Sequence, residues 1–259
     1  MVYLQDVCLA SYISINKTLI MILNKIRYLY IDKLLKRVNL LSASEYLSYL
    51  RHYGIMIGNN TYISPDAIVD ITRPSLVTIG NDCYLNSGFK LLTHDWVAGV
   101  MRHVYGEFLN SSGRVTIGNN VGTGYNVTIL KGVTIGDNVF IAANSLVTKD
   151  VPSNCVVGGT PAKVLGSLDD YRQKRLQQCE AEALDYARSI RERFDREPSV
   201  EEFYEEFSWF VDNENEREYP SLPISAQLGG GGGYLTWKKS HKRKYDNFEE
   251  FLKASKIQK

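Results

Sequence analysis

The middle of the sequence repeats with a period of six residues, and this repeat constrains the fold more than any other feature. An α-helix would repeat every 3.6 residues and an ordinary strand every two. A period of six instead predicts a short strand and a turn, again and again. Eleven of the twelve repeat positions are Ile, Leu or Val: Ile57, Ile63, Val69, Ile79, Leu85, Leu91, Ile117, Thr123, Ile129, Ile135, Ile141 and Val147.

A second, mostly small residue lies four positions after each of these, as in Ala67, Val127 and Val139. Gly-Asn and Gly-Asp pairs follow several of the predicted strands, and these residues tolerate the left-handed backbone that tight corners need. The inward side chains of each coil are buried only by the next coil. The fold class predicted is an all-β core, a parallel β-helix, with α-helical accessory segments at both ends.

Differences in composition and residue pattern divide the chain into three regions. Residues 1–54 form a predicted helical segment, residues 55–165 form the β-helix, and residues 166–259 form a C-terminal helical extension. Within the β-helix, residues 95–114 interrupt the coils directly after His94. A loop of this length inside a compact domain is uncommon and usually functional.

The N-terminal region combines apolar and basic residues over 13–38. This pattern fits a packed amphipathic helix pair, and it also fits a basic helix that lies on a membrane surface. Ser42 and Glu45 form a predicted capping box for a helix that ends near His52, with Gly54 as its C-cap.

The C-terminal region begins with a predicted helix over 168–196. Ser199 and Glu202 form a second capping box, which predicts a helix over 200–211. Residues 229–233 are five glycines and predict a flexible linker. The basic run over 238–244 is interpreted as a solvated tail, with an acidic partner or weak membrane-surface contact as the alternative.

Composition excludes several classes of protein. The chain has 30 Lys and Arg against 29 Asp and Glu, so no single sign of charge favours nucleic acid. The four cysteines lie far apart without a CxxC pair, which predicts neither a disulfide framework nor a zinc site. No secretory signal and no apolar stretch of about 20 residues is evident. We expect a cytoplasmic protein, with a peripheral position at the inner face of the membrane as a variant.

Two motifs in the β-helix resemble the hexapeptide-repeat acyltransferases. The runs VTKDVP (147–152) and GTPAK (159–163) are similar to the signature that ends the family's β-helix, and LTHDW (92–96) is similar to its catalytic coil. The resemblance covers residues 55–166 and is closest to the galactoside, maltose and saccharide O-acetyltransferase branch. It implies a left-handed parallel β-helix, assembled as a homotrimer with active sites between neighbouring subunits.

The resemblance implies that His94 is the catalytic base. A histidine can take the proton of an attacking hydroxyl and return it to the leaving group. Its second ring nitrogen needs an acceptor, for which Asp95 and a backbone carbonyl are both candidates. Four further residues are candidates for contact with the acceptor, with a solvent-facing turn or loop position as the alternative for Asn86, Asp70 and His103: Asn86, Asp70, Trp96 and His103.

The resemblance also implies a groove for acetyl-CoA as co-substrate. The residues that it places there are Gly124, Tyr125, Ala142, Ala143, Thr148, Lys149 and Lys163. The two alanines leave room for the pantetheine arm, and the two lysines supply charge for the phosphates. Gly122 departs from the family, in which many relatives carry an aromatic residue, and Tyr125 or Trp96 could replace that ring.

The function predicted is acetyl-CoA-dependent O-acetylation of a saccharide or sugar-like hydroxyl, with surface-polysaccharide modification as the setting. One alternative is N-acetylation of a nucleotide-linked amino sugar or of a drug. A catalytically inactive binding or scaffold module is another. No metal is expected, because a zinc hydratase on this fold would need about three histidine ligands, and only His94 and His103 lie near the coils.

Overall fold

The computed structural model describes residues 41–229 and 231–256, and the chain divides into two compact units between Asp169 and Asp170. The first unit is a left-handed parallel β-helix, as the sequence predicts. The amphipathic segment predicted over 13–38 lies outside the described residues. Within the described ranges, no helix is both long enough and apolar enough to cross a membrane.

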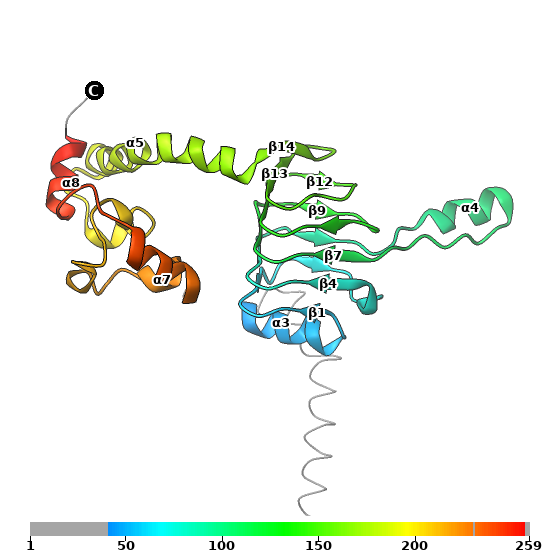
Figure 1. The fold of residues 1–259 in the computed structure, drawn as a ribbon. Coiled ribbons are helices and arrows are strands. Elements are labelled where there is room, and N and C mark those ends of the chain that lie inside the picture. The colour runs from blue at the N-terminus through cyan, green and yellow to red at the C-terminus, as the bar shows by residue number, and fades with distance from the viewer. Residues whose placement is uncertain (1–40, 230, 257–259) are drawn as a thin grey trace, which may run out of the picture. The chain divides into compact units, whose positions relative to one another are not determined.

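Each coil of the first unit contributes one short strand to each of three sheets (Figure 1). The first sheet contains β1 (Met56–Ile57), β4 (Val77–Ile79), β7 (Val115–Ile117) and β10 (Thr134–Ile135). The second contains β2 (Tyr62–Ile63), β5 (Tyr84–Leu85), β8 (Val121–Thr123), β11 (Val139–Ile141), β13 (Cys155–Gly158) and β14 (Lys163–Ser167). The third contains β3 (Ile68–Val69), β6 (Lys90–Leu91), β9 (Thr128–Ile129) and β12 (Leu146–Val147).

The repeat positions align in register from coil to coil. Ile57 pairs with Ile79, Ile79 with Ile117, and Ile117 with Ile135 along the first sheet. The eleven aliphatic repeat positions belong to one continuous core, in which Ile57 is the half-buried member, and the twelfth position, Thr123, is also buried. The six-residue period therefore places these side chains inside the prism, where each covers the next.

Three edges join the sheets. The edge after the first sheet carries a ladder of side-chain amides, in which Asn120 donates to Asn138 at 2.8 Å and Asn138 donates to Asn154 at 2.9 Å. These asparagines have positive φ angles, which their side chains tolerate better than most. The edge after the second sheet, which includes 86–88, 124–126 and 142–144, is named the Gly124 edge. The edge after the third sheet, which includes 70–72, 92–94, 130–132 and 148–150, is named the His94 edge.

Helix α3 (Ala43–His52) covers one end of the coil stack (Figure 1). The predicted capping box is confirmed, because the Ser42 side chain accepts from the Glu45 amide and the Glu45 carboxylate accepts from the Ser42 amide. Tyr46 and Leu50 are buried in the β-helix core, and the Tyr46 hydroxyl donates to the Ala67 carbonyl at 2.8 Å. The helix therefore buries the aliphatic stripe that the first coil would otherwise expose.

The interruption after His94 contains a helix that the sequence had not predicted. Helix α4 (Val97–Tyr105) ends at Gly106, whose φ of 70° is left-handed, and the segment projects from the coils (Figure 1). An antiparallel bridge between His94 and Ser112 closes its base. The short 3₁₀ turn η2 (Pro74–Leu76) marks the smaller interruption.

The second unit is helical and has its own aromatic core. Its elements are α5 (Leu168–Phe194), η3 (Val200–Phe203), η4 (Phe207–Trp209), η5 (Glu216–Glu218), α6 (Ile224–Gln227), α7 (Gly231–Ser240) and α8 (Phe248–Ser255). The core includes Phe203, Phe210, Trp237 and Phe251. The second capping box is present, but it opens a 3₁₀ turn, so the continuous helix predicted over 200–211 is wrong.

Parts of the glycine run and of the basic run take up regular structure or form ion pairs in this unit. Residues 231–233 open α7, and this helix is anchored by Trp237, which is nearly buried in the aromatic core. Packing offsets the cost of glycine in a helix, which is about 1 kcal/mol per residue. Four cations of the basic run contact acidic residues of the same unit: Lys238 with Glu216, Lys242 with Glu214, Arg243 with Asp212, and Lys244 with Glu180.

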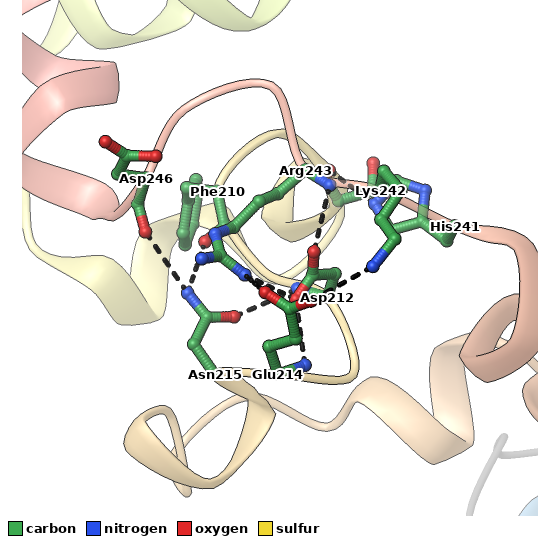
Figure 2. A network of polar contacts seen from close by, with 9 residues as sticks. Phe210, Asp212, Glu214, Asn215, His241, Lys242, Arg243 and Asp246 are labelled. Atoms are coloured by element: carbon green, nitrogen blue, oxygen red, sulfur yellow. Dashed lines mark hydrogen bonds and ion pairs between the residues drawn. The ribbon is translucent and has the colours of Figure 1, made fainter.

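Figure 2 shows how this basic run is held. Arg243 donates to the buried carboxylate of Asp212 at 2.5 Å, and the His241 ring contacts the Ser208 carbonyl at 2.7 Å. Burial opposes ionisation of Asp212, but hydrogen bonds from the Glu214 and Arg243 amides and from the Arg243 guanidinium lower its pKa. Arg243 is therefore paired with a buried carboxylate, whereas Lys242 forms an exposed pair.

Candidate active site

His94 follows strand β6 on the edge after the third sheet, beside a carboxylate from the preceding coil. Its Nδ1 atom is 2.7 Å from Oδ2 of Asp70, and the imidazole is about one-third exposed while Asp70 is nearly buried. The pairing of Val69 with Leu91 brings the two residues together although they are far apart in sequence. A carboxylate on Nδ1 fixes the tautomer in which Nδ1–H donates and Nε2 is free to accept.

Asp70 is itself held by several donors. Its Oδ1 accepts from the Thr72 amide at 2.9 Å and from the Thr72 hydroxyl at 2.6 Å. Its Oδ2 accepts from the hydroxyl of the buried Thr93 and from His94. Burial opposes ionisation, but the hydrogen bonds from Thr72, Thr93 and His94 more than offset it and hold the pKa of Asp70 well below its usual range. The dyad therefore carries a fixed anion behind the imidazole.

Asp95, the neighbour considered as the orienting group, faces another partner. Its carboxylate accepts from Lys131, from Ser111 at 3.0 Å, and from the Val97 amide at 3.0 Å. The Lys131 hydrogen bond and the Val97 amide lower the pKa of Asp95 to about 2. Asp95 thus ties the two ends of the projecting segment to the next coil, and the acceptor for His94 is Asp70.

The projecting segment carries two of the predicted acceptor residues. Trp96 precedes α4 and is 68% exposed, and the Arg102 guanidinium lies 5.8 Å from the centroid of its ring. Gly99 permits this arrangement, because a Cβ there would collide with the indole. His103 lies on the exposed part of α4. Neither residue contacts the His94–Asp70 dyad through a described hydrogen bond.

The Gly124 edge gathers the residues expected to hold the pantetheine arm. Gly124, Tyr125, Ala142 and Ala143 follow strands β8 and β11, which lie side by side. A Cβ on Gly124 would lie 2.5 Å from the Ala143 amide nitrogen, so the close approach of these coils requires glycine. Ala143 and Tyr125 are exposed. The edge therefore offers exposed positions, with a small side chain at Ala143, against which a narrow chain could lie.

Asn86 belongs to this edge and not to that of Asp70, so these two candidate acceptor residues lie on different edges of the prism. The backbone amide of Asn86 donates to the Thr123 hydroxyl at 2.9 Å, and its side-chain Oδ1 accepts from the Ser87 backbone amide at 2.8 Å. Lys163 begins β14 and pairs with Gly158, next to the same edge. Thr148 and Lys149 follow β12 and so lie on the His94 edge. The predicted residues are thus divided between two edges of one prism.

Gly122 leaves a gap in an outward-facing aromatic row on the second sheet. It is paired with Tyr84 on one side and Phe140 on the other. Tyr62 and Tyr84 stack with ring centroids 4.5 Å apart, and Tyr84 is 54% exposed. A Cβ on Gly122 would make only an ordinary contact with Phe140, so packing does not require glycine there.

Three residues of the site, Thr72, Thr93 and Lys131, are not among those that the sequence indicates. Thr93 and Lys131 each lie two residues after an inward position, Leu91 and Ile129, so the six-residue period itself places them on the edge of His94. The Asp70-Ile-Thr72 spacing is that of a local side-chain turn. Among the residues that the structure describes, no group of three His, Cys, Asp or Glu side chains could hold a metal ion.

The dyad can act as a general base. A neutral imidazole with Nδ1–H bound to a carboxylate presents Nε2 to a substrate proton, and the carboxylate stabilises the imidazolium that forms. A partly exposed ring is accessible to a hydroxyl. The site therefore fits a reaction in which a hydroxyl or amine is deprotonated as it attacks.

Comparison with known proteins identifies the family of the β-helix. Residues 114–149 match the family model described as bacterial transferase hexapeptide (six repeats). Protein CapG of Staphylococcus aureus is 42% identical over 132 residues, which cover 51% of this chain and 76% of CapG. Galactoside O-acetyltransferase of Escherichia coli (strain K12) is 37% identical over 141 residues, covering 48% of this chain and 68% of the relative.

Among solved structures, a galactoside acetyltransferase in complex with coenzyme A is 28% identical, with a TM-score of 0.40, and the match covers 49% of this chain and 71% of that one. The relatives in sequence match over more than two thirds of their own length at well above 30% identity. The chain therefore belongs to the bacterial hexapeptide-repeat transferase family and is an acyltransferase of that family.

Proposed function

We propose that this chain is an acetyl-CoA-dependent O-acetyltransferase that modifies a hydroxyl of a saccharide. The observation that carries the proposal is the His94–Asp70 dyad, with 2.7 Å between Nδ1 and Oδ2 and a free Nε2 on a partly exposed ring. The similarity to a galactoside O-acetyltransferase supports a sugar hydroxyl as the acceptor. Modification of a surface polysaccharide in the cytoplasm is the setting that we propose.

Nε2 of His94 takes the proton of the acceptor hydroxyl while its oxygen forms the new bond to the acetyl carbon. The same nitrogen then returns this proton to the sulfur that leaves, so the base is regenerated. Asp70 keeps the ring in the required tautomer and stabilises the cationic ring between these two events. The donors on Asp70 keep that carboxylate ionised and in place.

The residues of the Gly124 edge fit the co-substrate. Acetyl-CoA supplies an acetyl thioester on a long, narrow arm that ends in phosphates. Ala143 is small and exposed, so the edge leaves space for such an arm. Lys149 and Lys163 are exposed cations that can contact phosphate oxygens.

We propose that a complete site forms between two chains of a homotrimer. His94 and Lys149 lie on one edge of the prism, whereas Gly124, Ala143 and Lys163 lie at another. A strand of the third sheet separates the two edges, a span on the order of 15 Å for about five extended residues. When the His94 edge of one chain faces the Gly124 edge of another, both sets reach one substrate. The exposed apolar residues of α4 and its flanks, Trp96, Val100, Val104 and Phe108, also favour a covering partner.

Activity is tested by incubating the protein with acetyl-CoA and a panel of saccharides and measuring CoA release and product mass. Acetyl esters are cleaved by mild base and amides are not, so base treatment of the product separates O- from N-transfer. A base-stable product would replace this proposal with N-acetylation. No transfer to any saccharide or amino sugar would count against it altogether.

Mixed assembly tests the shared site. His94→Ala removes the base, and Ala143→Trp blocks the other edge at an exposed position. Each variant alone should be inactive. Co-expressed chains should regain activity, because a mixed trimer contains one interface with both native edges. If mixing restores nothing while sedimentation shows mixed trimers, each site lies within one chain.

A further inference from the structure

The second unit contains a cavity that the transferase reaction does not use. It has a volume of about 530 Å³, within the range of small-molecule sites. Three segments that are separate in sequence form it: η5 and the residues after it, α6, and α7. Its residues all belong to the C-terminal unit, away from the His94–Asp70 dyad in sequence.

The floor of the cavity is apolar and its walls are aromatic. Leu222 and Ile224 are buried beneath it as members of the unit's core. Tyr219 is fixed at both ends, because its ring packs edge-on against Phe210 at 5.6 Å and its hydroxyl accepts from the Phe248 amide at 3.1 Å. Pro220 and Pro223 also line the cavity and restrict the backbone. The wall is therefore largely preformed.

One side of the cavity is a closed polar cluster. Tyr234 donates its hydroxyl proton to Glu216 at 2.5 Å, and Lys238 contacts the other oxygen of Glu216 at 3.1 Å. Lys238 also donates to the Tyr234 hydroxyl at 3.2 Å. These three side chains satisfy one another, so the charge of Lys238 is compensated and the ring of Tyr234 is held in place.

Arg217 is the lining charge that remains uncompensated. It is exposed, and within the described parts of the chain it has no ion-pair partner and no hydrogen-bonded acceptor for its guanidinium. The lining thus carries two cations against one anion, with the surplus on a side chain that binds carboxylates and phosphates through two parallel hydrogen bonds. A ligand that matches this cavity has one anionic group and a compact body with both apolar and polar faces.

We propose that this cavity is a second binding site, for a sugar that carries one carboxylate or phosphate group. The anionic group binds Arg217, and the sugar ring lies between Tyr219 and Tyr234 with its hydroxyl groups toward Glu216 and Ser225. The choice of a sugar rests on the proposed function, since a saccharide acceptor is what the transferase would need to retain. Such a site would hold an acidic saccharide while the β-helix acetylates it.

Isothermal titration of the full chain with four probes tests this inference. Glucuronic acid or glucose 6-phosphate should bind at least about tenfold more tightly than glucose, as a charge-assisted hydrogen bond implies. Binding of only one of the two anionic sugars identifies which group the site takes. Equal binding of glucose would overturn the role of Arg217, and equal binding of inorganic phosphate would overturn recognition of a sugar.

Two variants and a matched control locate the site. Arg217→Ala should raise the Kd of the anionic sugar about tenfold or more. Ala226→Trp places a large ring at an exposed lining position and should also abolish binding, with thermal unfolding measured to show that the unit is intact. Lys239→Ala removes an exposed cation one residue beyond Lys238 that does not line the cavity. If Lys239→Ala weakens binding as much as Arg217→Ala, the attraction is non-specific and the inference fails.

The same titration in His94→Ala, without acetyl-CoA, separates this inference from the proposed transferase. Sugar binding should persist there at the wild-type Kd. A chain that transfers acetyl groups but binds no anionic sugar at Arg217 overturns the second site alone. A chain that binds the sugar through Arg217 but transfers nothing overturns the proposed reaction alone.

Discussion

His94 and Asp70 lie on neighbouring coils with 2.7 Å between Nδ1 and Oδ2, so the stacking of the β-helix itself assembles the dyad. Four further donor atoms, the backbone amides and hydroxyls of Thr72 and Thr93, hold the carboxylate. The imidazole is therefore oriented by the rigid core and not by the projecting segment that begins at Asp95.

We expect His94→Ala to lower kcat by about 10²–10⁴-fold, the usual contribution of a general base. His94→Asn, which is similar in size but cannot take the proton, should be nearly as impaired. Steady-state kinetics with saturating acetyl-CoA measures both. Binding of CoA, followed by titration, should change little. A variant that keeps more than about a tenth of kcat would show that another group activates the acceptor.

Asp70→Asn and Asp95→Asn should affect different kinetic constants. Asp70→Asn removes the anion that orients and stabilises the imidazole, so kcat should fall roughly 10²-fold or more. Asp95→Asn loosens the ion pair with Lys131 at the base of the projecting segment, so the KM of the acceptor should rise while kcat changes little. Equal losses of kcat in the two variants would contradict the assignment of Asp70 as the positioning residue.

The depressed pKa of Asp70 makes the stability of the β-helix depend on pH. A group whose pKa is lower in the folded state stabilises the fold above its unfolded pKa, which is about 3.9 for Asp. This contribution should be complete above about pH 5 and lost as the pH falls below about 4. Urea unfolding between pH 3 and 7 measures it. Asp70→Asn should flatten the acid part of the curve, and an unchanged slope would mean that the carboxylate is not held as described.

Lys149→Ala combined with Lys163→Ala should raise the KM of acetyl-CoA roughly tenfold, as two exposed charge contacts of about 0.7 kcal/mol each would give. The KM of the acceptor should stay constant, and the effect should shrink at high salt. Lys174→Ala, an exposed lysine of α5, is the control. If the KM of acetyl-CoA is unchanged in the double variant, neither lysine contacts the co-substrate.

Asp212→Ala should destabilise the C-terminal unit by on the order of 3 kcal/mol, because it leaves Arg243 without its buried partner. Unfolding followed by tryptophan fluorescence, to which Trp209 and Trp237 of this unit contribute, measures the change. Acetyl transfer to a small acceptor should persist at temperatures where this unit is still folded. A loss below about 0.5 kcal/mol, the range of exposed pairs, would show that the pair is solvated.

The sequence by itself determined the β-helix and its core. A period of six residues indicates stacked coils of short strands and turns. It also identified the inward positions from Ile57 to Val147, because burial favours aliphatic side chains there. It also determined the cap at Ser42 and the place of His94 at the end of a coil. These features depend on the pattern of residues that are close in sequence, so they can be predicted without knowledge of the tertiary structure.

Only the tertiary structure decided which side chains meet. Asp70 reaches His94, and Asp95 reaches Lys131, because the coils stack in a register that the inserted segments do not disturb. The same stacking divided the expected site between two edges. In the C-terminal unit, the basic run became structural because Arg243 and Lys244 meet acids that are remote in sequence. The sequence shows only the sign of each charge, whereas the tertiary structure decides which charges come within contact distance.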